Sequence, residues 1–211
     1  MSSVVDICNM ALSRIGVSQR IDDLEEASLE AEQCSLFYEH SRDFVLRADC
    51  DWGFATAFSD LAEVTENPDP GYQHAYAMPV DCMRARRIVN QTFPVIDWPY
   101  CDMQAYPQFP EIKFRVINGS SNRLIATNVS PAKLEYTLKV ESPEMFDPIF
   151  VSALAWKLGA NIAPALSRDA STAGSCEGQY REEILRAAAA ALNEGVSTYP
   201  RESVFITGRG Q

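Results

Sequence analysis

The sequence of 211 residues lacks the short motifs by which many enzymes are recognised. It has no G-x-x-x-x-G-K-[ST] loop, no G-x-G-x-x-G, no H-E-x-x-H and no G-x-S-x-G. The sequence therefore contains no short motif for nucleotide or dinucleotide binding, or for zinc-protease or esterase activity. Histidine is scarce, with only His40 and His74 in the chain. These absences predict a protein without a catalytic residue, a cofactor or a metal ion.

Two weaker chemical patterns are present. Cys82 with His74 as its base resembles a thiol nucleophile, but such a base needs a third orienting group, and the surroundings follow no protease signature. Neighbouring acids such as Asp49 and Asp51 resemble the carboxylate pair of a glycosidase. The chain has 29 acidic residues, however, so chance pairs are expected. A buried, inert cysteine and solvated loop acids are the simpler interpretations.

The chain also lacks a C-x-x-C pair, a basic N-terminal region followed by an apolar run, and an apolar stretch long enough to span a bilayer. We therefore expect reduced thiols inside an intracellular protein rather than disulfides or zinc ligands, and no membrane partner. The six cysteines are Cys8, Cys34, Cys50, Cys82, Cys101 and Cys176.

Positive charge is in deficit, with 18 Lys and Arg against 29 Asp and Glu and a formal net charge of -11. A chain of this sign repels phosphate, so DNA that it touches is expected to slide past rather than be gripped. The one compact basic cluster is Arg84, Arg86 and Arg87. In a strand the first two share one side and the third faces the other. That alternation favours a solvated or interfacial strand edge over a nucleic-acid groove.

Helical patterning is present at both ends of the chain. Ser2 or Ser3 can cap a first helix, whose apolar residues recur every three or four positions and which Gly16 can end. A longer second helix follows an acidic connection. Its apolar face is expected to be buried, and His40 lies on it as a core or interface residue. That face comprises Leu29, Gln33, Leu36, Phe37, His40, Phe44, Val45 and Ala48.

Two further helices are predicted near the other end. Asp147 and Pro148 form a cap followed by proline at the first helical position, and the helix after them is apolar nearly all round and hence buried. Pro164 is expected to end it. The last helix is predicted from residue 171 to residue 193. Its alanine run at 187–191 allows neighbouring helices, including those of other copies, to approach closely.

The middle of the chain follows a different pattern. Prolines recur between residues 68 and 131 and forbid long helices, while short alternating or β-branched runs indicate strands. Asn118 and Gly119 give a strong signal for a hairpin turn. The predicted strands span residues 54–58, 83–90, 112–117, 123–126 and 133–140.

These patterns predict a mainly helical protein with a β-rich insert, of the α+β class. Apolar faces from the two chain ends cover one another most easily in an antiparallel bundle of about four helices, formed by residues 1–50 and 142–195. Residues 51–141 then form the inserted lobe. Residues 196–211 form an extended C-terminal segment.

The C-terminal segment and the insert carry apolar residues that a free chain would not normally expose. Too few residues follow Gly195 to form a core of their own, so the C-terminal segment is expected to bind a partner. Aromatic residues of the insert are candidates for an interface, the alternative being that they pack inside the lobe. The predicted partner-binding residues of the C-terminal segment are Tyr199, Val204, Phe205 and Ile206. Those of the insert are Trp98, Tyr100, Tyr106 and Phe109.

Three stretches resemble the head-to-tail adaptor proteins of short-tailed bacteriophages, the family that includes tail tubular protein A and the tail accessory factors. The first is VDICNMALSRIG at 5–16, followed by the long second helix and DWGF at 51–54. The second is YAMPVDCMR at 76–84, similar to a Tyr-x-Leu-Pro-x-Asp-Cys-Leu-Arg pattern with methionines where leucines are usual. The third runs from FDPIF at 146–150 through ALAWKLGA at 153–160 to the last helix.

The resemblance implies a structural protein of the virion with no catalytic residue. Such adaptors are expected to form a ring of about twelve copies beneath the portal. The ring continues the DNA channel without sequence-specific binding, and it supports the tail nozzle and in some cases fibres. The C-terminal segment would reach the portal. The protein would then lie at the head-tail junction, in a virion assembled in the host cytoplasm.

Two alternatives stay open at this point. Another phage connector or tail-completion ring would share the helices but meet different neighbours, and binding to portal and nozzle proteins distinguishes it. A virion-associated cell-wall hydrolase would clear a peptidoglycan suspension and lose that activity when one acid is replaced.

Overall fold

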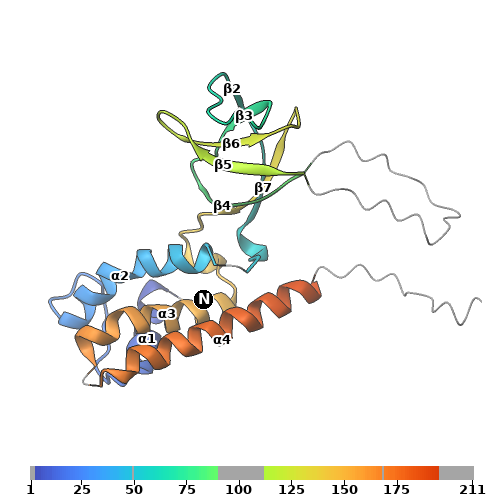
Figure 1. The fold of residues 1–211 in the computed structure, drawn as a ribbon. Coiled ribbons are helices and arrows are strands. Elements are labelled where there is room, and N and C mark those ends of the chain that lie inside the picture. Colours follow the sequence, from blue (N-terminus) through green and yellow to red (C-terminus); the bar gives the residue numbers. More distant parts are fainter. Residues whose placement is uncertain (1–2, 49, 90–111, 168, 195–211) are drawn as a thin grey trace, which may run out of the picture.

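Helices from both ends of the chain lie next to one another in the computed structural model, and a lobe of strands stands beside them (Figure 1). The structure describes residues 3–48, 50–89, 112–167 and 169–194. These residues form a mixed α+β structure with four α-helices and two antiparallel sheets, as the sequence predicts. We call the helices with their caps the helical lobe, and the strands between residues 56 and 138 the β lobe.

The first helix, α1 (Val4–Arg14), is confirmed together with its signals. Ser3 is the N-cap: its Oγ accepts a hydrogen bond from the Asp6 N–H at 3.1 Å, and the Asp6 carboxylate accepts one from the Ser3 N–H at 2.9 Å. This reciprocal pair satisfies two N–H groups that the helix itself leaves free. Gly16 follows the helix with a φ of +81°, a left-handed conformation that glycine adopts at little cost.

The second helix, α2 (Leu29–Leu46), is also confirmed, but half of the residues that were expected to be buried are exposed. Leu29, Leu36 and Phe44 are 53%, 64% and 45% exposed. His40 is exposed as well, so of its two expected roles the one in the core is wrong, and the one at an interface stays a prediction. The residues of α2 that are buried are Ala31, Cys34, Tyr38, Ser41, Arg42, Val45 and Leu46.

The buried stripe of α2 has the same helical period as the exposed one, but it mixes small and polar residues. Ser41 Oγ accepts a hydrogen bond from Asn161 Nδ2 at 2.9 Å. Ala31 and Cys34 have small side chains on the same side, which lets the helix approach its neighbours closely. The sequence prediction followed the large apolar side chains of Leu29, Leu36 and Phe44, and it gave no weight to small residues and buried hydrogen bonds.

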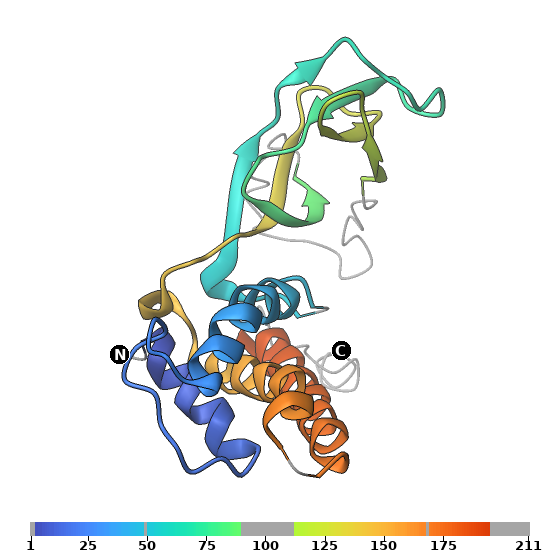
Figure 2. The same cartoon turned by 90° about the vertical axis from the view of Figure 1, so that its left-hand side faces the viewer.

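The third helix, α3 (Pro148–Leu166), is the centre of the helical lobe. Asp147 caps it by accepting a hydrogen bond from the Ile149 N–H at 2.7 Å. It packs against α1, α2 and the fourth helix, α4 (Ser171–Glu194) (Figure 2). Pro164 lies inside α3 and does not end it, because the helix continues two residues further. The residues of α3 with no exposed surface are Phe150, Ala153, Leu154, Ala155, Leu158 and Ile162.

By length and composition alone, α3 is apolar enough to cross a bilayer. The expectation that no stretch is long enough was therefore wrong. Core helices of proteins outside membranes pass the same test, and α3 has the central position of such a helix among α1, α2 and α4. A membrane location does not follow from it.

The β lobe consists of two antiparallel sheets. The first has the order β1 (Thr56–Asp60), β7 (Lys133–Leu138), β4 (Cys82–Ile88). The second has the order β2 (Glu63–Val64), β3 (His74–Ala77), β6 (Arg123–Thr127), β5 (Phe114–Asn118). Strands β5 and β6 form the hairpin expected at Asn118 and Gly119. Their buried side chains, with those of neighbouring strands, form a core separate from that of the helices. It contains Tyr76, Cys82, Ile88, Ile125, Ala132, Leu134 and Tyr136.

Two short connections join the lobes. The outgoing one contains the 3-10 helix η1 (Gly53–Ala55), and the returning one contains the 3-10 helix η2 (Pro143–Met145). Strand β1 therefore begins at Thr56, because the first residues of its predicted span belong to η1. Both connections enter the same end of the helical lobe, near the start of α3 (Figure 2).

Candidate functional site

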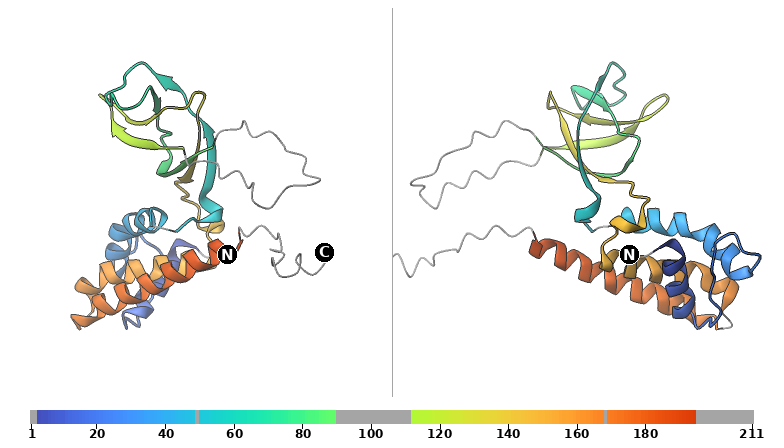
Figure 3. Two further views of the ribbon diagram at one scale, coloured as in Figure 1. Left: turned by 45° about the vertical axis from the view of Figure 1, so that its right-hand side comes forward. Right: turned by 180° about the vertical axis from the view of Figure 1, so that it is seen from behind.

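The partner-binding residues predicted from the sequence lie outside the described residues. They are Trp98, Tyr100, Tyr106, Phe109, Tyr199, Val204, Phe205 and Ile206. The structure does place the points to which their segments attach. Residues 90–111 connect β4 with β5 in the β lobe, and residues 195–211 follow the end of α4 in the helical lobe. These attachment points lie on the same side of the molecule in the view of Figure 1 and in the view from behind (Figure 3, right).

The basic cluster of β4 joins the two lobes. Arg84 Nη1 donates a hydrogen bond to the Ala48 carbonyl just beyond α2, at 3.0 Å. Arg86 Nη2 donates to the Trp52 carbonyl at 3.2 Å. The first two arginines thus share a side and face the helical lobe, as the strand alternation predicts, while Arg87 has a largely exposed side chain. Their partners in the structure are protein groups, and the cluster is interfacial within the chain.

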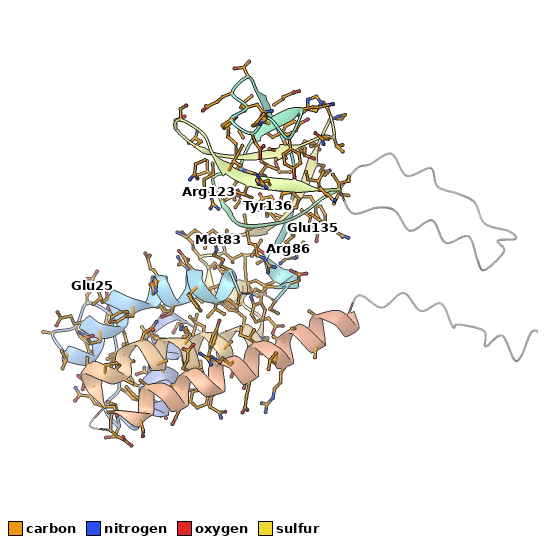
Figure 4. The ribbon with its side chains drawn as sticks, viewed as in Figure 1. Glu25, Met83, Arg86, Arg123, Glu135 and Tyr136 are labelled. Atoms are coloured by element: carbon orange, nitrogen blue, oxygen red, sulfur yellow. The ribbon has the colours of Figure 1, made fainter. Side chains whose placement is uncertain are left out.

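Arg86 lies at the boundary of the two lobes (Figure 4), and only 7% of its side chain is exposed. Its guanidinium donates to Thr56 Oγ1 at 2.8 Å and to Thr137 Oγ1 at 2.9 Å. Burial lowers the pKa of Arg86 from its usual value, and the carboxylates of Asp51 and Glu135 oppose that shift. The buried cation therefore depends on a complete set of partners in order to be tolerated.

A cluster of aromatic rings lies below this arginine. The Phe150 ring is 5.0 Å from Trp52, 5.1 Å from Phe54 and 4.8 Å from Phe146, measured between centroids. Trp52 Nε1 donates to the Val45 carbonyl at 3.0 Å, so the indole is fixed by α2 as well. The rings come from both connections and from α3, and together with Arg86 they set the position of the β lobe on the helical lobe.

A half-open cavity of about 90 Å³ lies beside this junction. It is lined by Cys50, Asp51, Trp52, Gly53, Phe54, Asp147, Ile149, Ala187, Ala190 and Ala191. The alanine run of α4 is thus turned mainly toward the molecule's own junction, and Ala187 is buried. The expectation that this run meets another copy is not favoured, since only Ala189 of the run is exposed.

The thiol of Cys82 has an environment that disfavours nucleophilic attack. Burial raises its pKa to about 11, so the thiolate is a minor form at neutral pH. His74, the base considered for it, is on β3 in the other sheet, where its Nδ1 lies 2.7 Å from Glu63 Oε1. The simpler interpretation, a buried cysteine at the start of a strand, agrees with this position.

Exposed apolar side chains on the helical lobe form the other candidate surface. Leu29 and Leu36 lie one above the other on α2, seven residues apart. On α4, Leu185 is 71% exposed. The α2 stripe was recognised from the sequence, but it was assigned to the core and not to the surface.

The family models and the curated proteins that were searched offer no site to transfer to these surfaces. The functional interpretation therefore depends on the residues and on their arrangement. No family model matches the chain, and a search of curated proteins finds no match.

Proposed function

We propose that the chain is a head-to-tail adaptor of a short-tailed phage virion, a structural protein that forms a ring of about twelve copies between the portal and the tail nozzle. One observation carries the proposal: each lobe holds the attachment point of one candidate partner-binding segment. The C-terminal segment follows the helical lobe and is assigned to the portal. The insert segment at 90–111 belongs to the β lobe and is assigned to the nozzle, or to fibres.

The junction between the lobes supports this assignment. An adaptor transmits the position of one partner to the other, so its two binding regions need a fixed relation. Arg84 and Arg86 connect β4 to the helical lobe, and the ring cluster around Phe150 packs beneath them. A chain with two independent lobes would not need a buried guanidinium at their boundary.

Within the helical lobe, we propose the antiparallel bundle that the sequence predicts. On α2 and α3, Ser41 meets Asn161 while Phe44 meets Lys157, so the two helices run in opposite directions. Lys157 lies over the Tyr180 ring while Gly159 lies beside Cys176, which supports the same relation between α3 and α4. Such a bundle is a stiff body on which a ring can be built.

The charge of the chain is compatible with a DNA channel. With a formal net charge of -11, a ring of many copies presents a strongly acidic body. A repulsive wall lets DNA pass without being held, so no sequence-specific contact is expected. The basic cluster of β4 does not contradict this, because Arg84 and Arg86 bond to groups within the chain.

The proposal is tested by mixing the purified chain with portal rings of the phage that encodes it and imaging the product by electron microscopy. We expect an added layer of about twelve copies, coaxial with the portal. The control is the same portal preparation without the chain. A chain that leaves the portal bare would contradict the proposal, as would one that clears a peptidoglycan suspension.

A further inference from the structure

The outward face of α2 is an apolar surface that the subunit does not use. Leu29 and Leu36 are 53% and 64% exposed, and a spacing of seven residues puts them on one line along the helix. Gln33 and His40 lie between and beside them on the same face. This face is opposite the buried residues of α2, so it points directly away from the helical lobe.

The outward face of α4 has a complementary character. Leu185 is 71% exposed, and Gly178 lies seven residues before it on the same line of the helix. One turn earlier is Gly174. A Cβ at either glycine would meet nothing within 4 Å, so packing inside the subunit does not require their small size. The face offers shallow space beside one projecting leucine, a shape that accepts leucines from another helix.

The charges flanking the two faces also match. On α2, the exposed acids Glu32 and Glu39 flank the leucines with the same seven-residue spacing. On α4, Arg181 and Arg186 flank Leu185, with 75% and 68% of their side chains exposed. The exposed acid Glu182 lies between Leu185 and Arg186 and pairs with the latter. Their ion pairs within α4 are long, between 3.6 and 3.8 Å, so the guanidinium groups have N–H donors to offer a second carboxylate.

These two faces cannot cover one another within one subunit. Both helices pack on α3, and they flank it from different sides, so their outward faces point in different directions (Figure 2). A contact between two different faces of identical copies is head to tail, and a repeat of such contacts closes into a ring when the rotation allows it. The occupant of the α2 face that fits this geometry is therefore a second copy of the chain.

We propose that the α2 face of each copy, built on Leu29 and Leu36, packs against the α4 face of the next copy, built on Leu185. The inference rests on the proposed ring, and it names the surfaces that form it. Leu36 and Leu185 lie in the contact, Gly174 and Gly178 allow the helices to approach, and Glu32 and Glu39 face the arginines of α4 in the neighbouring copy.

Two full-length variants test the contact by sedimentation velocity. Leu36→Glu places a negative charge in the α2 face, and Leu185→Glu places one in the α4 face. The wild-type chain should form large species as its concentration rises, and each variant alone should stay monomeric. An equimolar mixture should give dimers and nothing larger, because only one intact pair of faces remains. Val80→Glu, at a fully exposed turn of the β lobe, is the matched control and should associate as the wild type does.

The outcomes separate this inference from the proposed function. If Leu185→Glu associates normally while Leu36→Glu does not, the contact is not with α4 and the inference is overturned. If the wild-type chain stays monomeric in solution, the wild type and both variants are imaged by electron microscopy on portal rings. Full rings formed by both variants would overturn the inference about the contact. They would leave the proposed adaptor function intact. A wild-type chain that forms no ring in either experiment overturns both. Circular dichroism should show native helix content in each variant, since both leucines are exposed.

Discussion

Replacing Phe150 with alanine is expected to lower the free energy of unfolding by about 4 kcal/mol. Phe150 has no exposed surface and is the ring that Trp52, Phe54 and Phe146 share. The substitution removes the transfer free energy of a buried ring and leaves a cavity in a place where three other rings cannot all move inward. Urea unfolding followed by circular dichroism measures the change.

The matched control for this prediction is Phe58→Ala. Phe58 lies on β1 with 55% of its surface exposed, so its loss should change the free energy of unfolding by less than about 0.5 kcal/mol. Equal destabilisation by the two substitutions would show that the ring cluster around Phe150 does not hold the junction as described.

Replacing Arg86 with methionine is expected to lower the free energy of unfolding by about 3 kcal/mol. Methionine keeps much of the side-chain volume but removes every donor. The Thr137 hydroxyl then loses its donor, and the Thr56 hydroxyl and the Trp52 carbonyl keep only the hydrogen bond between them, in a place that water reaches poorly. The lobes should also become more mobile relative to one another, and faster proteolysis of the connections near residues 49–55 would report it.

Arg87→Met is the control on the same strand. Its side chain is 64% exposed, although the Glu135 carboxylate with which it pairs is largely buried. Arg86 stays 4.0 Å from that carboxylate, so the cost of Arg87→Met should be smaller than that of Arg86→Met, about 1–2 kcal/mol. If Arg87→Met lowers the free energy of unfolding more than Arg86→Met does, then Arg86 is not the arginine that stabilises the junction. That result would refute the junction as described.

The helices could be predicted because their signals are residues close to the helix ends in the sequence. Ser3 caps α1, Asp147 caps α3 and Gly16 follows α1, and each does so through bonds or dihedrals within a few residues. The strands β2 and β3 were missed, because β2 has two residues and β3 four, too few to show a period. Strand β3 depends on pairing with β6, and β2 on pairing with β3, and no local pattern reports either pairing.

The junction could be predicted only in part, because its bonds join residues distant in sequence. Arg84 and Ala48 are 36 positions apart, and Arg86 and Thr137 are 51 apart. Alternation in a strand gave the correct sides for the arginines, but not the groups that they meet. The orientation of α2 was predicted wrongly for a related reason. Two stripes of α2 could have faced the core, the one with Leu29 and Leu36 and the one with Ser41. Which of them is buried depends on how closely α3 approaches Ser41.

The most direct test of the adaptor account is portal binding by a chain that ends at residue 194. The account predicts that this shortened chain keeps the helical circular dichroism of the full chain, because α1 to α4 and their contacts are complete by Glu194. It should no longer cosediment with portal rings, because residues 196–211, with Tyr199, Val204, Phe205 and Ile206, are proposed to make that contact. A shortened chain that binds portal rings as well as the full chain does would contradict the account.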